Sequence, residues 1–199
     1  MAEHGYDAGD ITVPEFDELV RRRPGLFFGR GDPRSATEVL RGVLDHALHP
    51  AARVAPPHVP RVVVEVRGDL AFSVVDDQAD ALGGRDLPRP GYFGSLLGPN
   101  RWVTAAAAAL SAHATVEVWR DGRGFRQDLT GLRPTGRPEP FAAPAGAGTR
   151  VVLDLDPGFC TAAITTDLGA VDPHGPGCAE LPAALVVLRD LRPTGSPAR

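Results

Sequence analysis

Four short segments that form two pairs, each pair joined through a tight turn, constrain the fold of this chain more than any other feature, and the first pair is rich in β-branched residues. The segments are residues 61–66, 70–75, 115–120 and 124–129. Gly68-Asp69 joins the first pair and Asp121-Gly122 joins the second. Glycine and aspartate tolerate the backbone angles of two-residue hairpin turns. The sequence therefore predicts two antiparallel hairpins, and residues 150–155 and 184–191 predict two more strands.

A helix is predicted over residues 37–49. Ser35 followed three positions later by Glu38 is a capping box, a pattern that begins helices, and Pro50 prevents continuation. Apolar side chains at helical spacing form one face: Leu40, Val43, Leu44, Ala47 and Leu48. The opposite face carries Gly42, Asp45, His46 and His49. Such a polar face is either the solvated side of an amphipathic helix or the lining of a site.

The order of the elements predicts an α+β fold. An alanine-rich helix over residues 102–112 lies between the two hairpins. Helices placed between antiparallel pairs are typical of a two-layer sandwich, in which a mixed, mainly antiparallel sheet carries helices on one face. We expect a single domain over residues 13–192, with a flexible arm at residues 1–12 and a disordered tail at residues 193–199.

Two segments rich in glycine and proline interrupt this pattern. Residues 78–100 form a long loop, and loops of this length are commonly functional or disordered. Residues 134–148 are expected to be a surface connection.

Composition restricts the partners of the protein. The net charge of the 199 residues is −4, and the 21 basic residues, all arginine, form no basic block. Nucleic-acid binding needs clustered cations, so we expect no direct nucleic-acid partner. The sequence has no apolar run of the roughly 20 residues that a membrane helix requires. Cys160 and Cys178 lack zinc-type spacing and a preceding secretory segment. We expect a cytoplasmic protein with reduced, inert thiols, from a GC-rich bacterial genome.

Residues 20–29, Val-Arg-Arg-Arg-Pro-Gly-Leu-Phe-Phe-Gly, are similar to the Val-Arg-Lys-Arg-Pro-Gly-Met-Tyr-Ile-Gly segment that opens the ATPase domain of gyrase B. Further segments resemble the same domain in the same order: residues 43–48, 72–77, 108–127 and 146–153. The chain thus resembles the ATPase domain of gyrase B and topoisomerase IV, in the GHKL superfamily of chaperones, histidine kinases and mismatch-repair ATPases. The resemblance implies a Bergerat-type fold whose ATP pocket is lined by the polar face of the helix over residues 37–49.

The resemblance implies an altered catalytic helix. The family pattern is Glu-X-X-Asp-Asn, in which glutamate activates water and asparagine holds magnesium. This chain has Gly42 in place of the glutamate, then Asp45, and His46 in place of the asparagine. Glycine has no side chain that could act as a base. Magnesium prefers oxygen ligands to imidazole. We therefore expect no ATP hydrolysis, weak binding of ATP or ADP with magnesium, and no certain cofactor.

The resemblance also implies a base-binding site at Asp76, which stands where the family aspartate accepts the adenine amino group. Asp77 follows it, and the family glycines are replaced by Gln78 and Asp80. The glycine-rich phosphate loop aligns with residues 97–103, where Arg101 could supply a charge. The predicted ligand-binding residues are His46, Asp76, Asp77, Arg101, Trp102 and Thr149.

Three function classes remain open. The first is a module that binds a nucleotide, metabolite or gyrase-type inhibitor in the former ATP pocket without hydrolysis. The second is a repurposed enzyme of specialised metabolism, with acid–base or cyclase chemistry at Asp45, His46 and His49. In that class a metal site of His46, His49 and Asp76 is conceivable, but we assign no metal. The third is a gyrase-mimicking interaction module, with a homodimer or a gyrase-related protein as partner.

Overall fold

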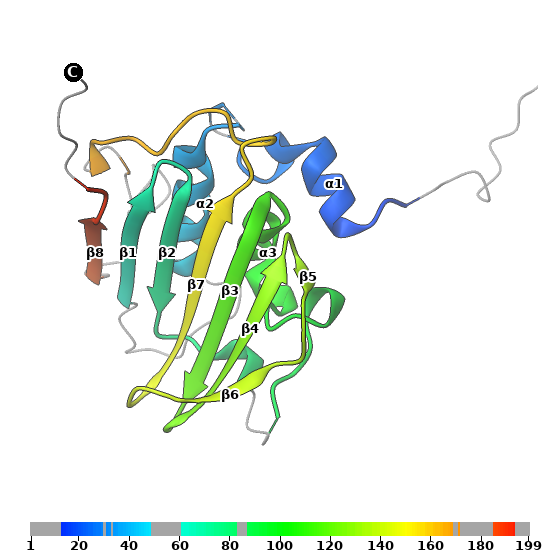
Figure 1. Ribbon diagram of the computed structural model, residues 1–199, viewed down its shortest axis with the longest axis vertical. Coiled ribbons are helices and arrows are strands. Elements are labelled where there is room, and N and C mark those ends of the chain that lie inside the picture. The colour runs from blue at the N-terminus through cyan, green and yellow to red at the C-terminus, as the bar shows by residue number, and fades with distance from the viewer. Residues whose placement is uncertain are drawn as a thin grey trace, which may run out of the picture.

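The computed structural model describes residues 13–29, 31–32, 34–48, 61–82, 87–168, 171 and 185–193. In these residues one mixed sheet of eight strands carries helices on one face (Figure 1). The helices are α1 (Phe16–Arg22), α2 (Ala36–Leu48) and α3 (Trp102–Ala109). The strands are β1 (Arg61–Gly68), β2 (Ala71–Asp76), β3 (Ser111–Arg120), β4 (Arg123–Thr130), β5 (Arg133–Pro134), β6 (Glu139–Ala142), β7 (Ala147–Leu155) and β8 (Leu185–Asp190). The predicted α+β class is confirmed.

The strand order is β5-β4-β3-β7-β2-β1-β8, and β6 pairs with β4. Both predicted hairpins form, because β1 pairs antiparallel with β2 and β3 with β4. Asp121 and Gly122 have φ angles of 53° and 80°, the positive values that a type I′ turn requires. The last strand, β8, pairs parallel with β1 and gives the sheet its mixed character.

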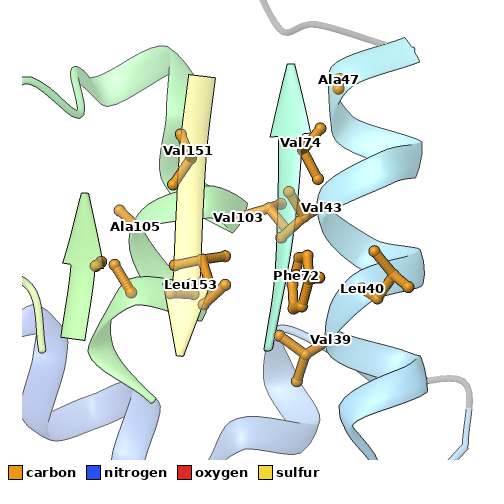
Figure 2. Packing of buried hydrophobic residues seen from close by; sticks show 14 of the residues in the cluster. Val39, Leu40, Val43, Ala47, Phe72, Val74, Val103, Ala105, Val151 and Leu153 are labelled. Atoms are coloured by element: carbon orange, nitrogen blue, oxygen red, sulfur yellow. The ribbon is translucent and has the colours of Figure 1, made fainter. Parts of the chain in front are cut away.

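The core lies between the sheet and the helices. Val62, Val64 and Val66 alternate along β1 and are fully buried. Figure 2 shows Val39 and Val43 of α2 beside Phe72 of β2, and Val103 of α3 beside Val43. The same cluster includes Leu40, Val74, Ala105, Val151 and Leu153. The predicted apolar face of the helix over residues 37–49 is therefore the buried face of α2. Burying each such Val, Leu or Phe side chain contributes about 1.5–3 kcal/mol.

One predicted helix end and one predicted helix cap need correction. The helix predicted over residues 102–112 ends at Ala109, because Ser111 already pairs with Leu155 of β7. The Ser111 hydroxyl donates to the carbonyl of Ala107 and closes the last turn. The capping box at the start of α2 does not form as predicted, because the Glu38 carboxylate pairs with Arg41 one turn along the helix. The N–H of Ser35 is bonded to the Asp32 carbonyl.

The segment 134–148 is not merely a surface connection. The segment begins at the end of β5, which pairs with β4, and it contains β6, which also pairs with β4. It leads into β7 at Ala147. Phe141 of β6 is the register partner of Gly124 of β4, and its ring lies so close to Gly124 that a β-carbon there would collide with it. A glycine on one strand and an aromatic ring on its neighbour thus extend the sheet.

Helix α1 was not predicted from the sequence. Val20 anchors it in the core, Arg21 Nε donates to the carbonyl of Ala109 at 3.0 Å, and Asp17 is bonded to Arg133.

The described part of the loop 78–100 contains short 3₁₀ turns, η3 (Asp80–Leu82), η4 (Tyr92–Gly94) and η5 (Pro99–Arg101). The predicted arm at residues 1–12 lies outside the described residues, as does the predicted tail after Pro193. Within the described residues, no helix combines the length and apolar character needed to cross a bilayer.

Candidate functional site

The centre of the candidate site is an ion pair between β2 and the start of α3. Asp76 ends β2 on the helix-facing side of the sheet, and Arg101 ends η5 directly before α3. Arg101 Nη1 donates to Asp76 Oδ2 at 2.7 Å, and Nη2 donates to Oδ1 at 2.8 Å. The exposed fractions are only 4% for Asp76 and 6% for Arg101. We call this buried, bidentate pair the Arg101–Asp76 latch.

Gln78 connects the latch to its surroundings. Its N–H donates to Asp76 Oδ1 at 3.0 Å, and its carbonyl accepts from Arg101 Nη2 at 3.1 Å. The same carbonyl accepts the Thr149 hydroxyl of β7 at 2.5 Å, and the Gln78 side-chain amide donates to the Ala47 carbonyl of α2. Both carboxylate oxygens of Asp76 and the carbonyl of Gln78 are thus bonded to groups of the chain itself.

The latch changes what Asp76 can bind. Charge-assisted hydrogen bonds are roughly twice as strong as neutral ones. Removing one member of a buried ion pair costs about 3–5 kcal/mol, because the other charge is left uncompensated. A neutral amino group, such as that of adenine, would have to replace a bidentate guanidinium at Asp76.

Gly42, at the position of the family glutamate, is covered by Phe28. A β-carbon on Gly42 would lie 3.0 Å from Cδ1 and 3.3 Å from Cε1 of Phe28. Phe28 is buried and stands where the quoted gyrase B segment has isoleucine. A buried ring therefore packs against α2 at the place where any residue other than glycine would carry its β-carbon.

His46 is held by backbone and aromatic contacts. Its Nε2 lies 2.7 Å from the carbonyl of Asn100, and because a carbonyl only accepts, Nε2 carries the proton and donates. Its ring makes an edge contact with Trp102 at 5.5 Å between centroids. Asp45 is exposed on α2, and His49 lies outside the described residues. The predicted cluster of Asp45, His46 and His49 is therefore untested, and among the described residues no three acidic, histidine or cysteine side chains form a metal site.

The segment before the latch is fixed at several points. Gln127 Oε1 accepts the N–H of Leu96 at 2.9 Å, and the N–H of Tyr92 donates to the Leu97 carbonyl. The Tyr92 ring stacks on the ring of Phe16 of α1 with 4.6 Å between centroids. Burial raises the pKa of the Tyr92 hydroxyl. These contacts hold η5, and with it Arg101, against Asp76.

Most of the predicted ligand-binding residues lie together. Asp76 and Thr149 are register partners on β2 and β7, Arg101 bonds to Asp76, and His46 and Trp102 lie side by side. Asp77, which follows Asp76, is half-buried. Sequence reasoning missed Phe28 and the bonding role of Gln78. A signal for the latch did exist, because a cation at a helix N-terminus is disfavoured by the helix dipole and calls for a carboxylate partner.

The opposite face of the sheet carries a separate hollow of about 410 Å³. The residues that line it include Val63, Val75, Trp119 and Phe141. Two glycines leave room for these rings, since Trp119 packs on Gly148 and Phe141 on Gly124. Glu117 also lines this hollow, where its Oε1 lies 3.8 Å from Arg126 Nη1 and its Oε2 lies 3.6 Å from Arg150 Nη1.

Comparison with known proteins relates the chain to DNA gyrase and topoisomerase 4. No protein-family model matches it. The novobiocin-resistant DNA gyrase B protein of Streptomyces niveus is 27% identical over 177 residues, covering 76% of this chain and 25% of the relative. The topoisomerase 4 B protein of Caulobacter vibrioides is 29% identical over 177 residues, covering 76% of this chain and 24% of the relative. This chain is a homologue of the B proteins of gyrase and topoisomerase 4.

The fold of this gyrase B homologue agrees with that relationship. The gyrase B protein from Myxococcus xanthus matches 88% of the chain with a TM-score of 0.60 and 24% sequence identity, and 53% of that chain is covered. The gyrase B homologue thus has the gyrase B ATPase-type fold. It spans about a quarter of the length of the curated relatives.

Proposed function

We propose that this gyrase B homologue is a non-hydrolysing module that binds a small ligand in the former ATP pocket, with the Arg101–Asp76 latch as an internal competitor. The observation that carries the proposal is the pair of Gly42 and Phe28. A hydrolytic base must reach the attacking water, and here the side chain is absent and its space is filled by a buried ring.

The grouping of polar residues supports ligand binding. Binding pockets are mostly apolar and contain a few convergent polar groups. Around the latch these are the Asp76 carboxylate, the Gln78 carbonyl and the Thr149 hydroxyl, with Trp102 partly exposed beside them. When only a fraction of the molecules is in the state that can bind, the apparent affinity for the ligand is reduced by that fraction. A ligand that enters therefore has to displace Arg101.

Calorimetric titration tests this function. ATP, ADP, a non-hydrolysable analogue and a gyrase-pocket inhibitor are titrated with and without magnesium into the wild type, Arg101→Ala and Asp76→Asn. We expect tighter binding to Arg101→Ala than to the wild type for at least one ligand, and loss of that binding in Asp76→Asn. ATP turnover by the wild type, measured as phosphate release, would contradict the proposal.

A second candidate is an interaction module that pairs with a gyrase-related protein or with a second copy. The closed latch favours it, because the domain keeps its gyrase B-type fold with Asp76 already satisfied inside the chain. Light scattering during size-exclusion chromatography, with and without purified gyrase, tests it. A mass that stays at one copy of the chain in every mixture would remove this candidate. The acid–base enzyme has less support, since Nε2 of His46 is bonded to Asn100.

A further inference from the structure

We infer that the subsite at Asp76 selects a planar cation, a guanidinium or amidinium group on a small molecule, and discriminates against neutral bases such as adenine. This inference rests on the proposed function, because it names the ligand class of the same pocket. It follows from how the chain itself fills the subsite.

The acceptors at Asp76 match a guanidinium in number and direction. Asp76 Oδ1 and Oδ2 accept from two different nitrogens of Arg101 at 2.8 and 2.7 Å, which is the parallel two-bond geometry of a guanidinium and a carboxylate. The carbonyl of Gln78 accepts from Nη2 at 3.1 Å and supplies a third acceptor. An amidinium has the same paired N–H donors and can make the first two bonds.

The charge of the subsite gives the selectivity. With Arg101 withdrawn, the Asp76 carboxylate remains at the buried end of β2, where the N–H of Gln78 donates to it at 3.0 Å. A buried carboxylate needs a countercharge, because an unpaired buried charge is strongly destabilising. A neutral donor restores hydrogen bonds and leaves the charge uncompensated, whereas a guanidinium restores both.

The position of Arg101 shows why the intact protein would bind such a ligand weakly. The guanidinium of Arg101 is attached to a segment that Gln127 and Phe16 hold in place, so its local concentration at Asp76 is high. An external ligand has to displace the Arg101 guanidinium from Asp76, and the neighbouring residue Trp102 has an exposed fraction of 39%. We therefore expect removal of the Arg101 side chain to raise the affinity for the planar cation by about ten-fold or more.

The test is chemical rescue of Arg101→Ala. Methylguanidinium and benzamidinium are added at millimolar concentration, far below denaturing levels, and methylurea and adenine serve as neutral probes. Thermal unfolding and calorimetry are recorded. We expect both cations to raise the unfolding midpoint of Arg101→Ala and to bind about ten-fold more tightly than methylurea or adenine. The effect should vanish in Arg101→Ala/Asp76→Asn.

Arg192→Ala is the matched control. Arg192 also pairs with an aspartate, since its Nε lies 2.9 Å from Asp190 Oδ1, but the Asp190 side chain is partly exposed. Water can solvate that carboxylate after the substitution, so methylguanidinium should give no rescue. Equal rescue of both variants would mean a general effect of the cation and would overturn the inference.

The other outcomes separate the two proposals. If adenine or ATP binds Arg101→Ala more tightly than the cations do, the selectivity inferred here is wrong and the proposed ligand-binding function stands. If a folded Arg101→Ala binds neither class, both are wrong. Should Arg101→Ala not fold, Arg101→Gln replaces it, with hydrogen exchange of the wild type as a second measurement. Methylguanidinium should speed exchange at residues 100–103 of the wild type and methylurea should not, and equal exchange with both would overturn the inference.

Discussion

Two residue pairs define the candidate site. Phe28 and Gly42 are complementary in size, and Arg101 and Asp76 are complementary in charge. In both pairs a side chain of the protein itself packs against or bonds to the candidate position, Gly42 or Asp76.

Replacing Gly42 with glutamate should not restore ATP hydrolysis. The new β-carbon would lie 3.0 Å from Cδ1 of Phe28, so the crowded ring must shift by a few tenths of an ångström to admit the side chain. Such overpacking costs about 1–3 kcal/mol. Phosphate release and urea unfolding measure the two effects. Gly42→Glu/Phe28→Ile should recover part of the stability, and ATP turnover by Gly42→Glu alone would contradict the prediction.

The Arg101–Asp76 latch should dominate the mutational sensitivity of the site. Asp76→Asn leaves the Arg101 guanidinium buried without a countercharge and should lower the free energy of unfolding by about 3–5 kcal/mol. Arg101→Met/Asp76→Asn should lose less than the sum of the two single changes, because neither charge remains. Additive losses in this double-mutant cycle would show that the pair is not coupled. Asp190→Asn, which breaks a pair whose aspartate is partly exposed to water, should have a smaller effect.

Cys160 should react slowly with thiol reagents. Burial, followed by the charges of Asp156 and Asp32, raises the pKa of this thiol from 9.0 to about 11. The folded state therefore favours the protonated thiol, and the stability gained from it is complete below pH 9 and lost as the pH rises toward 11. In a Cys178→Ser background, labelling at pH 8 should follow unfolding, and the free energy of unfolding should fall between pH 9 and 11. Fast labelling of the folded protein at pH 8 would argue against it.

At the scale of elements, a row of contacts across the sheet depends on glycine. A β-carbon on Gly148 of β7 would collide with Trp119 and lie 2.7 Å from the carbonyl of Asp76. We expect Gly148→Ala to destabilise the protein by about 1–3 kcal/mol. Gly136→Ala is the control, since nothing lies within 4 Å of its β-carbon, and it should be close to neutral. Chemical unfolding of both variants measures the difference, and equal stability of the two would exclude close packing at Gly148.

The sequence predicted the elements that local chemistry determines. Apolar spacing gave α2, and the turn residues Asp121 and Gly122 gave the β3–β4 hairpin. The end of α3 was wrong, because pairing of Ser111 with β7 overrides the helix propensity of the alanines. The short strand β6 was missed, since Pro140 and Phe141 form a strand only through their contact with β4.

The site was predictable only as far as family motifs extend. Asp76 and Thr149 fall in matched strands, and their pairing across β2 and β7 follows from the strand order. The bond between Arg101 and Asp76 joins residues that are 25 positions apart, with a long loop between them. Its geometry depends on the paths of η4 and η5, which no local pattern determines.

At the scale of the whole molecule, one core and one sheet join the described residues. The segment after β7 returns to α2, where the N–H of Ala36 donates to Ala162, and Arg192 beyond β8 donates to Ile164. We therefore predict a single cooperative unfolding transition, with equal calorimetric and van't Hoff enthalpies. Two separate transitions in a calorimetric scan would disprove the single-domain prediction.

The placement of the two tryptophans gives the protein a built-in optical readout. Trp102 is 39% exposed beside the latch, and Trp119 is 8% exposed on the opposite face of the sheet. Because a solvated indole emits at longer wavelength than a shielded one, the two rings should give distinguishable fluorescence. In Trp119→Phe the remaining tryptophan emission comes from Trp102 alone. A change in its emission wavelength, or in its quenching by iodide, would therefore report in real time on movement of Arg101.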